Sequence, residues 1–168
     1  MRRIIIRIVS LFLTGIFQSS FFNLIGVGRS GVKPNFLFLI IVFYALFLGS
    51  YEGAITGFWA GLVQDIISGR VIGVYAIIGL TAGLLIGLLK GRIYRENTII
   101  NAFLVFILTM IYEFIVAVCL GINLWERGNF FYCFKNIILI EAIYNTIMSL
   151  LVFRIMNRIE KQEVDYSG

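Results

Sequence analysis

Long apolar stretches, separated by short polar segments, run through the chain from end to end. A helix that crosses the hydrocarbon core of a membrane needs about 20 apolar residues. On this basis the sequence predicts six transmembrane helices, at residues 4–27, 35–49, 53–68, 72–89, 98–121 and 136–156. We therefore expect an all-α integral membrane protein in which residues 1–168 form a single six-helix domain.

One apolar run, residues 35–68, is too long for a single crossing. At about 1.5 Å per residue it would form a helix of about 50 Å, against a hydrocarbon core of about 30 Å. The polar segment from Gly49 to Gly53 lies in its middle, and glycines there favour a turn. Pro34 precedes the run, and proline is favoured in the first turn of a helix. We expect two short crossings, suited to a thin membrane or partly re-entrant.

The first apolar stretch has a secretory signal peptide as its alternative interpretation. Its apolar part is longer than that of a signal peptide. It also contains Arg7 and Gln18 and has no obvious small-x-small cleavage site. We therefore prefer a retained transmembrane helix.

The positions of the 14 lysine and arginine residues test the division into spans. With six spans, the side that holds both termini receives nine of them: Arg2, Arg3, Arg7, Lys90, Arg92, Arg95, Arg154, Arg158 and Lys161. The opposite side receives five: Arg29, Lys33, Arg70, Arg127 and Lys135. Because cytoplasmic loops are enriched in Lys and Arg, both termini are predicted to be cytoplasmic. The net charge of +5 then reflects topology and attraction to membrane lipid, and it gives little support to nucleic-acid binding.

Composition narrows the possible chemistry. Hydrophobic residues make up 60% of the chain and charged residues 14%, against about 25% charged in an ordinary soluble domain. The chain has no histidine, which excludes imidazole catalysis and His-ligated metal sites. Its two cysteines, Cys119 and Cys133, fit neither a disulfide framework nor a four-cysteine zinc site. We expect no cofactor and no metal, and a membrane-embedded enzyme is the least favoured class.

Eight of the 17 glycines recur at intervals of four residues, in two sets: Gly49, Gly53, Gly57 and Gly61, and Gly79, Gly83, Gly87 and Gly91. Residues at i and i+4 share a helix face, so each set predicts a stripe without side chains. Helices in lipid associate through close packing, which small residues permit. We expect the third and fourth spans to pack through these stripes, since neighbours in sequence are usually neighbours in space. A dimer interface is the alternative.

Carboxyl groups inside the predicted spans form the candidate functional site. Ionisable residues within a membrane are rare and usually functional. In the predicted orientation three carboxyl residues, Asp65, Glu113 and Glu141, lie in the outer half of the membrane. The candidate set also includes Arg70, Tyr144 and Asn145. Two interpretations stay open. The carboxyl groups either fix the helix register through polar partners, or they line an outward polar cavity or contact a partner's helix. No catalytic pair is indicated.

The segment from Asn123 to Lys135, between the last two spans, is aromatic and weakly charged. An aromatic belt at the membrane interface explains it. A lid, or a docking surface for an extracytoplasmic partner, is the second interpretation.

The most distinctive motif lies between Thr56 and Ile77. It has the pattern Gly-Phe-x-x-Gly-Leu-x-x-Asp followed by a further glycine, formed here by Gly57, Phe58, Gly61, Leu62, Asp65 and Gly73. Together with Pro34 and Asn35, this motif resembles the family of the rod shape-determining protein MreD. The length, the six spans, the internal termini and the basic loop at residues 90–95 are also similar to that family. The family often has an acidic residue where this chain has Asn35.

The resemblance implies a non-enzymatic scaffold of the bacterial cell-elongation and peptidoglycan-synthesis machinery in the cytoplasmic membrane. It implies binding to MreC, and through MreC an association with MreB filaments, a RodA-type glycosyltransferase and a class B penicillin-binding transpeptidase. It also implies a fold like that of the S-components of energy-coupling-factor transporters. The second hypothesis for function is such an S-component for a vitamin or metal. It is disfavoured by Gly15-x-x-x-Ser19 in the first span, where S-components typically carry Ala-x-x-x-Ala.

Overall fold

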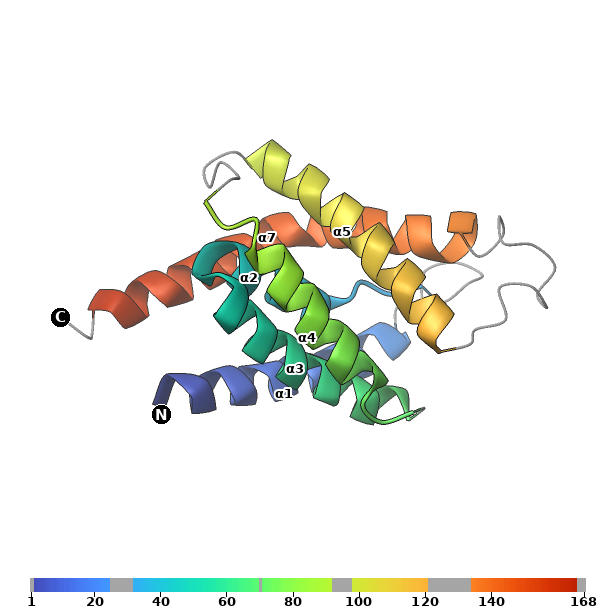
Figure 1. Ribbon diagram of the computed structural model, residues 1–168, viewed down its shortest axis with the longest axis horizontal. Coiled ribbons are helices and arrows are strands. Elements are labelled where there is room, and N and C mark those ends of the chain that lie inside the picture. The colour runs from blue at the N-terminus through green and yellow to red at the C-terminus, as the bar shows by residue number, and fades with distance from the viewer. Residues whose placement is uncertain (1, 25–31, 70, 92–97, 121–133, 166–168) are drawn as a thin grey trace.

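The computed structural model describes residues 2–24, 32–69, 71–91, 98–120 and 134–165 (Figure 1). The helices in this part of the chain are α1 (Arg2–Leu24), α2 (Phe36–Leu48), α3 (Ser50–Ser68), α4 (Val74–Gly87), α5 (Thr98–Cys119) and α7 (Leu139–Asp165), with a π-helical turn η1 (Phe134–Ile138) before α7. All the regular elements in these residues are helices. The prediction of an all-α protein is therefore confirmed.

Two helical segments are long and apolar enough to cross a membrane, Ile99–Cys119 and Phe134–Met156. Three shorter apolar segments, Val9–Ser20, Phe36–Leu48 and Val74–Gly87, lie in the predicted first, second and fourth spans. The full set of six crossings stays a prediction. Figure 1 shows the first residues of α1 and the last residues of α7 at the same end of the molecule's long axis.

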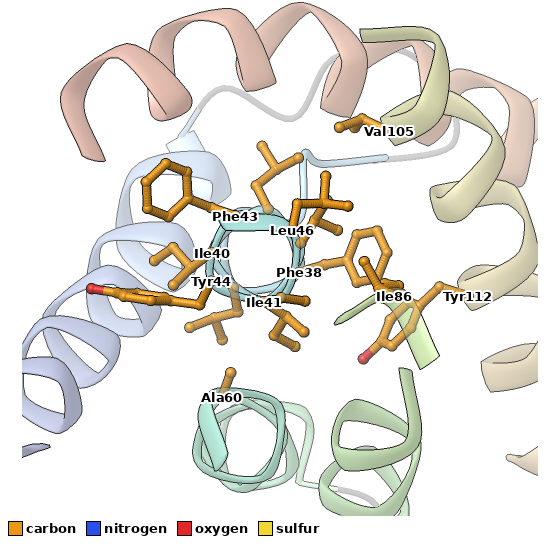
Figure 2. Close-up of a cluster of buried hydrophobic side chains, with 14 of the residues drawn as sticks. Phe38, Ile40, Ile41, Phe43, Tyr44, Leu46, Ala60, Ile86, Val105 and Tyr112 are labelled. Carbon is orange, nitrogen blue, oxygen red and sulfur yellow. The ribbon is translucent and has the colours of Figure 1, made fainter. Parts of the chain in front are cut away.

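The helix α2 is the centre of the bundle. All ten residues from Leu37 to Leu46 are buried, as expected for a helix that is apolar on every face. Figure 2, viewed along α2, shows its side chains pointing outwards in all directions, with Phe43, Phe38 and Tyr44 on different sides. Helices α1, α3, α4, α5 and α7 all contact it. A short helix can therefore organise the whole core.

Gly49 separates α2 from α3. Its φ of 107° lies in the left-handed region that glycine tolerates, and its N–H donates to the carbonyl oxygens of Tyr44 and Ala45. The ammonium group of Lys90 donates to the carbonyl oxygen of Leu48 at 2.6 Å and so caps the end of α2. The turn is shorter than predicted, because one glycine reverses the chain and α3 begins at Ser50.

Large apolar side chains cover the outer surface of the bundle. Leu13, Ile77, Phe103 and Ile147 are each more than half exposed, and they come from α1, α4, α5 and α7. Apolar surface of this extent would be an aggregation hazard in water. In lipid it is the ordinary exterior of a helix bundle.

Candidate functional site

The glycine stripes bring the backbones of α3 and α4 into direct contact. A methyl group placed on Gly57 would overlap the carbonyl group of Gly79, and one on Gly53 would meet that of Gly83. On Gly61 it would overlap the carbonyl of Tyr75. The two helices run side by side (Figure 1) and make the most extensive contact in the bundle. The structure thus places the two stripes against each other within one chain.

The outermost members of the two glycine sets lie outside the helices α3 and α4. Gly49 forms the turn between α2 and α3, and Gly91 follows the end of α4 with a φ of 80° and open space where a side chain would lie. The assignment of Gly91 as a helix-packing residue was therefore wrong, whereas Gly49 lies at positive φ in the turn with its backbone against Gly87. Gly87 is packed, but against the backbone of Ser50 and Gly49. A separate glycine, Gly15 of α1, allows close approach to Val63 of α3.

Asp65 caps the beginning of α4. It is 1% exposed, and its carboxylate accepts hydrogen bonds from the backbone N–H groups of Gly73 at 2.9 Å, Tyr75 at 3.0 Å and Ala76 at 3.1 Å. The first N–H groups of a helix have no partner within the helix, and the helix dipole favours a negative charge there. The carboxylate of Asp65 therefore has a structural partner of its own, from the adjacent helix.

A second polar cluster surrounds the beginning of α2, deep in the protein. The side-chain oxygen of Asn35 accepts from the N–H of Phe38 at 3.1 Å, as an N-cap. The side-chain oxygen of Gln18, from α1, accepts from the N–H groups of Phe36 at 2.9 Å and Leu37 at 3.4 Å. The N–H of Asn35 itself donates to Oδ1 of Asn145 on α7, at 2.7 Å. All four N–H groups that a helix start leaves unpaired are thus satisfied by side chains.

Glu113 and Glu141 extend this cluster towards its edge. Nδ2 of Asn35 donates to Oε1 of Glu113 at 3.5 Å. The carboxyl groups of Glu113, on α5, and Glu141, in the first turn of α7, lie close to each other. Both side chains are half-buried.

The structure divides the predicted site residues into separate groups. Glu113, Glu141 and Asn145 belong to one cluster, held together through Asn35. Asp65 serves the start of α4 instead. Tyr144 is half-buried beside Asn145 in the chain. Arg70 and the aromatic segment up to residue 133 lie outside the described residues.

Three residues of the cluster could not be singled out from the sequence. In the sequence, Gln18 stands out only as a residue unsuited to a signal peptide. Asn35 stands out only because the family often has an acidic residue at that position. Nothing in the sequence distinguishes Thr109. Thr109 is fully buried and accepts from Nδ2 of Asn145 at 3.4 Å. The one indication available for all three was that they are polar side chains within apolar spans. A polar group in lipid is costly unless it has a hydrogen-bond partner.

The chemistry available at this cluster is hydrogen bonding. No group of three or more metal-ligating side chains occurs among the described residues. Amide and carboxyl groups from α1, α2, α5 and α7 meet there. The cluster thus ties four helices together and leaves two half-buried carboxyl groups at its edge.

Comparison with known proteins identifies the family. No solved structure matches the chain, so the resemblance to the S-component fold stays a prediction. The family model of the rod shape-determining protein MreD matches residues 2–159 of the 168. MreD proteins are membrane proteins that determine rod shape, and the apolar helices of this chain fit such a protein. The chain therefore belongs to the MreD family.

Proposed function

We propose that this protein is a non-enzymatic scaffold of the bacterial cell-elongation complex and that it binds MreC. Membership of the MreD family, over nearly the whole chain, carries the proposal and gives the protein a role in rod shape. Through MreC, the scaffold would associate with MreB filaments, a RodA-type glycosyltransferase and a class B penicillin-binding transpeptidase. The glycosyltransferase and the transpeptidase synthesise peptidoglycan, and the scaffold holds them in position.

The packing of the bundle supports a scaffold. The central helix α2 is buried on all sides, and its first N–H groups are held by side chains of α1 and α7. The backbones of α3 and α4 are in direct contact. Close packing and satisfied polar groups leave such a bundle few alternative arrangements. A bundle of this kind can present partner-binding surfaces in fixed positions.

We further propose that the chain crosses the cytoplasmic membrane six times with both ends in the cytoplasm. The excess of Lys and Arg on the side of the termini supports this orientation. Fusions of green fluorescent protein, which fluoresces only in the cytoplasm, and of alkaline phosphatase, which is active only outside, test it. The C-terminus and residue 95 should give fluorescence, and residue 70 should give phosphatase activity. Phosphatase activity at the C-terminus would refute the orientation.

The half-buried pair Glu113 and Glu141 is proposed as a polar contact for a partner's transmembrane helix. Both side chains are half-buried, and polar side chains hydrogen-bond across neighbouring helices in lipid. The double variant Glu113→Gln, Glu141→Gln keeps side chains of the same shape that can hydrogen-bond to each other. We expect it to fold normally and to capture less MreC.

Affinity purification from native membranes is the decisive experiment. The wild-type protein should co-purify MreC, and Thr109→Val, which changes the buried interior of the same cluster, serves as the matched control. If the wild-type protein captures a vitamin or an energy-coupling transmembrane subunit and no MreC, the scaffold proposal is wrong. A depletion strain that keeps its rod shape would also contradict it. Misfolding of the double variant would show that the pair is structural.

A further inference from the structure

A narrow apolar groove runs between α4 and α5, away from the polar cluster. Its volume is about 280 Å³. The floor includes Phe38 of α2, and the walls come from α4 and α5, with Ala82 and Leu108 among them. Figure 2 shows Phe38, Ile86 and Tyr112 together on this side of α2. The contact between α4 and α5 is much smaller than that between α3 and α4, so the groove opens where two helices diverge.

The dimensions of the groove select among possible occupants. Its lining on α4 extends from Ile78 to Leu89, a distance of about 16 Å at 1.5 Å per residue. The space open to the centre of a water-sized sphere is about 280 Å³, which over this length gives a width of about 7 Å between the walls once the sphere's radius of about 1.4 Å is added on each side. An α-helix with its side chains is about 10 Å across. Hydrocarbon chains pack at carbon distances of about 4 Å, so the groove fits one chain and is too narrow for a helix.

The length and the charge at one end indicate the source of that chain. About 16 Å is the depth of one leaflet, half of a hydrocarbon core of about 30 Å. Leu89 lines one end of the groove, and the next residue, Lys90, is exposed. The bond from Lys90 to the carbonyl oxygen of Leu48 uses one of the three N–H donors of the ammonium group. The remaining donors suit a phosphate group at the membrane surface.

We propose that the groove between α4 and α5 binds one acyl chain of an anionic phospholipid from the leaflet on the side of Lys90, with the lipid phosphate at Lys90. The lipid completes the packing between two helices that the protein itself leaves apart. This site is independent of the partner-binding function proposed above, and either can fail without the other.

Native mass spectrometry of the purified protein, titrated with phosphatidylglycerol or phosphatidylcholine, tests the proposal. The wild-type protein should retain phosphatidylglycerol in preference to phosphatidylcholine. Ala82→Phe fills the groove, and its retention of phosphatidylglycerol should fall roughly tenfold, the effect of losing about 1.4 kcal/mol of binding free energy. Lys90→Gln should abolish the preference between the two lipids. Leu84→Phe, on a lipid-exposed position of α4 that does not line the groove, is the matched control and should bind as the wild type does.

A second variant covers the case in which Ala82→Phe does not fold. Thr81 lines the groove but is exposed, so Thr81→Phe can block the groove from its edge without disturbing the core. Thr81→Phe should also retain less phosphatidylglycerol than the wild-type protein. Equal retention by Thr81→Phe and the wild type overturns the proposal. The proposal is also overturned if Thr81→Phe captures less MreC while its lipid retention is unchanged, because the groove would then bind a protein.

Discussion

The strongest test of the α3–α4 pairing is the replacement of Asp65. Its two carboxylate oxygens accept three backbone N–H groups, with Oδ2 accepting from Gly73 and Ala76 and Oδ1 from Tyr75. In Asp65→Asn, the side-chain amide has the same shape as the carboxylate but only one oxygen that can accept hydrogen bonds. If that oxygen takes the place of Oδ2, the NH₂ group faces the N–H of Tyr75, and two donors oppose each other.

The expected cost follows from this geometry. One buried N–H left without an acceptor costs about 1–3 kcal/mol, and loss of the negative charge at the helix start adds about 0.3–2 kcal/mol. Asp65→Asn should therefore lower the free energy of unfolding by about 1–5 kcal/mol. Asp65→Ala leaves three donors unpaired and should cost about 3 kcal/mol or more even at the lower end of that range. A marginally stable protein, at about 5–15 kcal/mol, would lose much of its stability.

Reversible unfolding in mixed detergent and dodecyl sulfate micelles, followed by circular dichroism, measures these differences. The neighbouring residue Gln64 gives a matched control, because its Oε1 is buried and has no partner among the described residues. Gln64→Met removes that unsatisfied oxygen and should leave stability unchanged or raise it by up to about 1 kcal/mol. Equal unfolding midpoints for Asp65→Asn and the wild type would refute the assignment of Asp65 as the cap of α4.

Three further variants test other parts of the bundle. Gly57→Leu should sharply reduce the yield of folded protein in membranes, because the leucine side chain would force apart two backbones that are in contact. Phe58→Leu, at an exposed position, is the control and should express normally. Equal expression of both variants would contradict the packing role of Gly57. Gln18→Leu leaves two N–H groups of α2 unpaired and should cost about 2–4 kcal/mol in the same unfolding assay. Thr109→Val removes the long hydrogen bond from Asn145 and the bond from the Thr109 hydroxyl to the carbonyl oxygen of Val105. It should cost about 1 kcal/mol, the lower end for one unpaired donor, because the bond from Asn145 is long; a larger loss than for Gln18→Leu would contradict this ranking.

Hydrophobic pattern and glycine spacing predicted much of the fold. Apolar runs gave the positions of the helices, because lipid requires each backbone polar group to be bonded within a helix. The four-residue glycine interval placed α3 against α4. The turn between α2 and α3 was predicted too long, since nothing in the local sequence distinguishes the left-handed Gly49 from the helical Gly53.

The polar cluster was only partly predictable. Glu113 and Glu141 were identified because carboxyl groups in apolar spans are unusual. The other members Gln18 and Asn35 were not identified, because each of their hydrogen bonds joins residues far apart in the chain. Such pairs depend on the rotation of each helix about its axis and on the depth at which α2 begins. Both are set by packing of the whole bundle, which no single span determines.

The family motif in α3 is explained by one structural unit. Gly57, Gly61 and Asp65 lie at four-residue steps, so they share one face of α3. The two glycines let the backbone of α4 approach, and Asp65, one turn further on, meets the N–H groups at the start of α4. The return of the chain passes through Gly69 and Gly73, both at positive φ.

This unit has a consequence for partner recognition. Gly57, Gly61 and the carboxylate of Asp65 are already engaged inside the chain, so they are not available to another protein. Phe58 differs, because it is 37% exposed on the outside of α3. A partner that recognises this region must therefore contact Phe58 and its exposed neighbours. The motif glycines and Asp65 would affect such a partner only by holding α3 and α4 together.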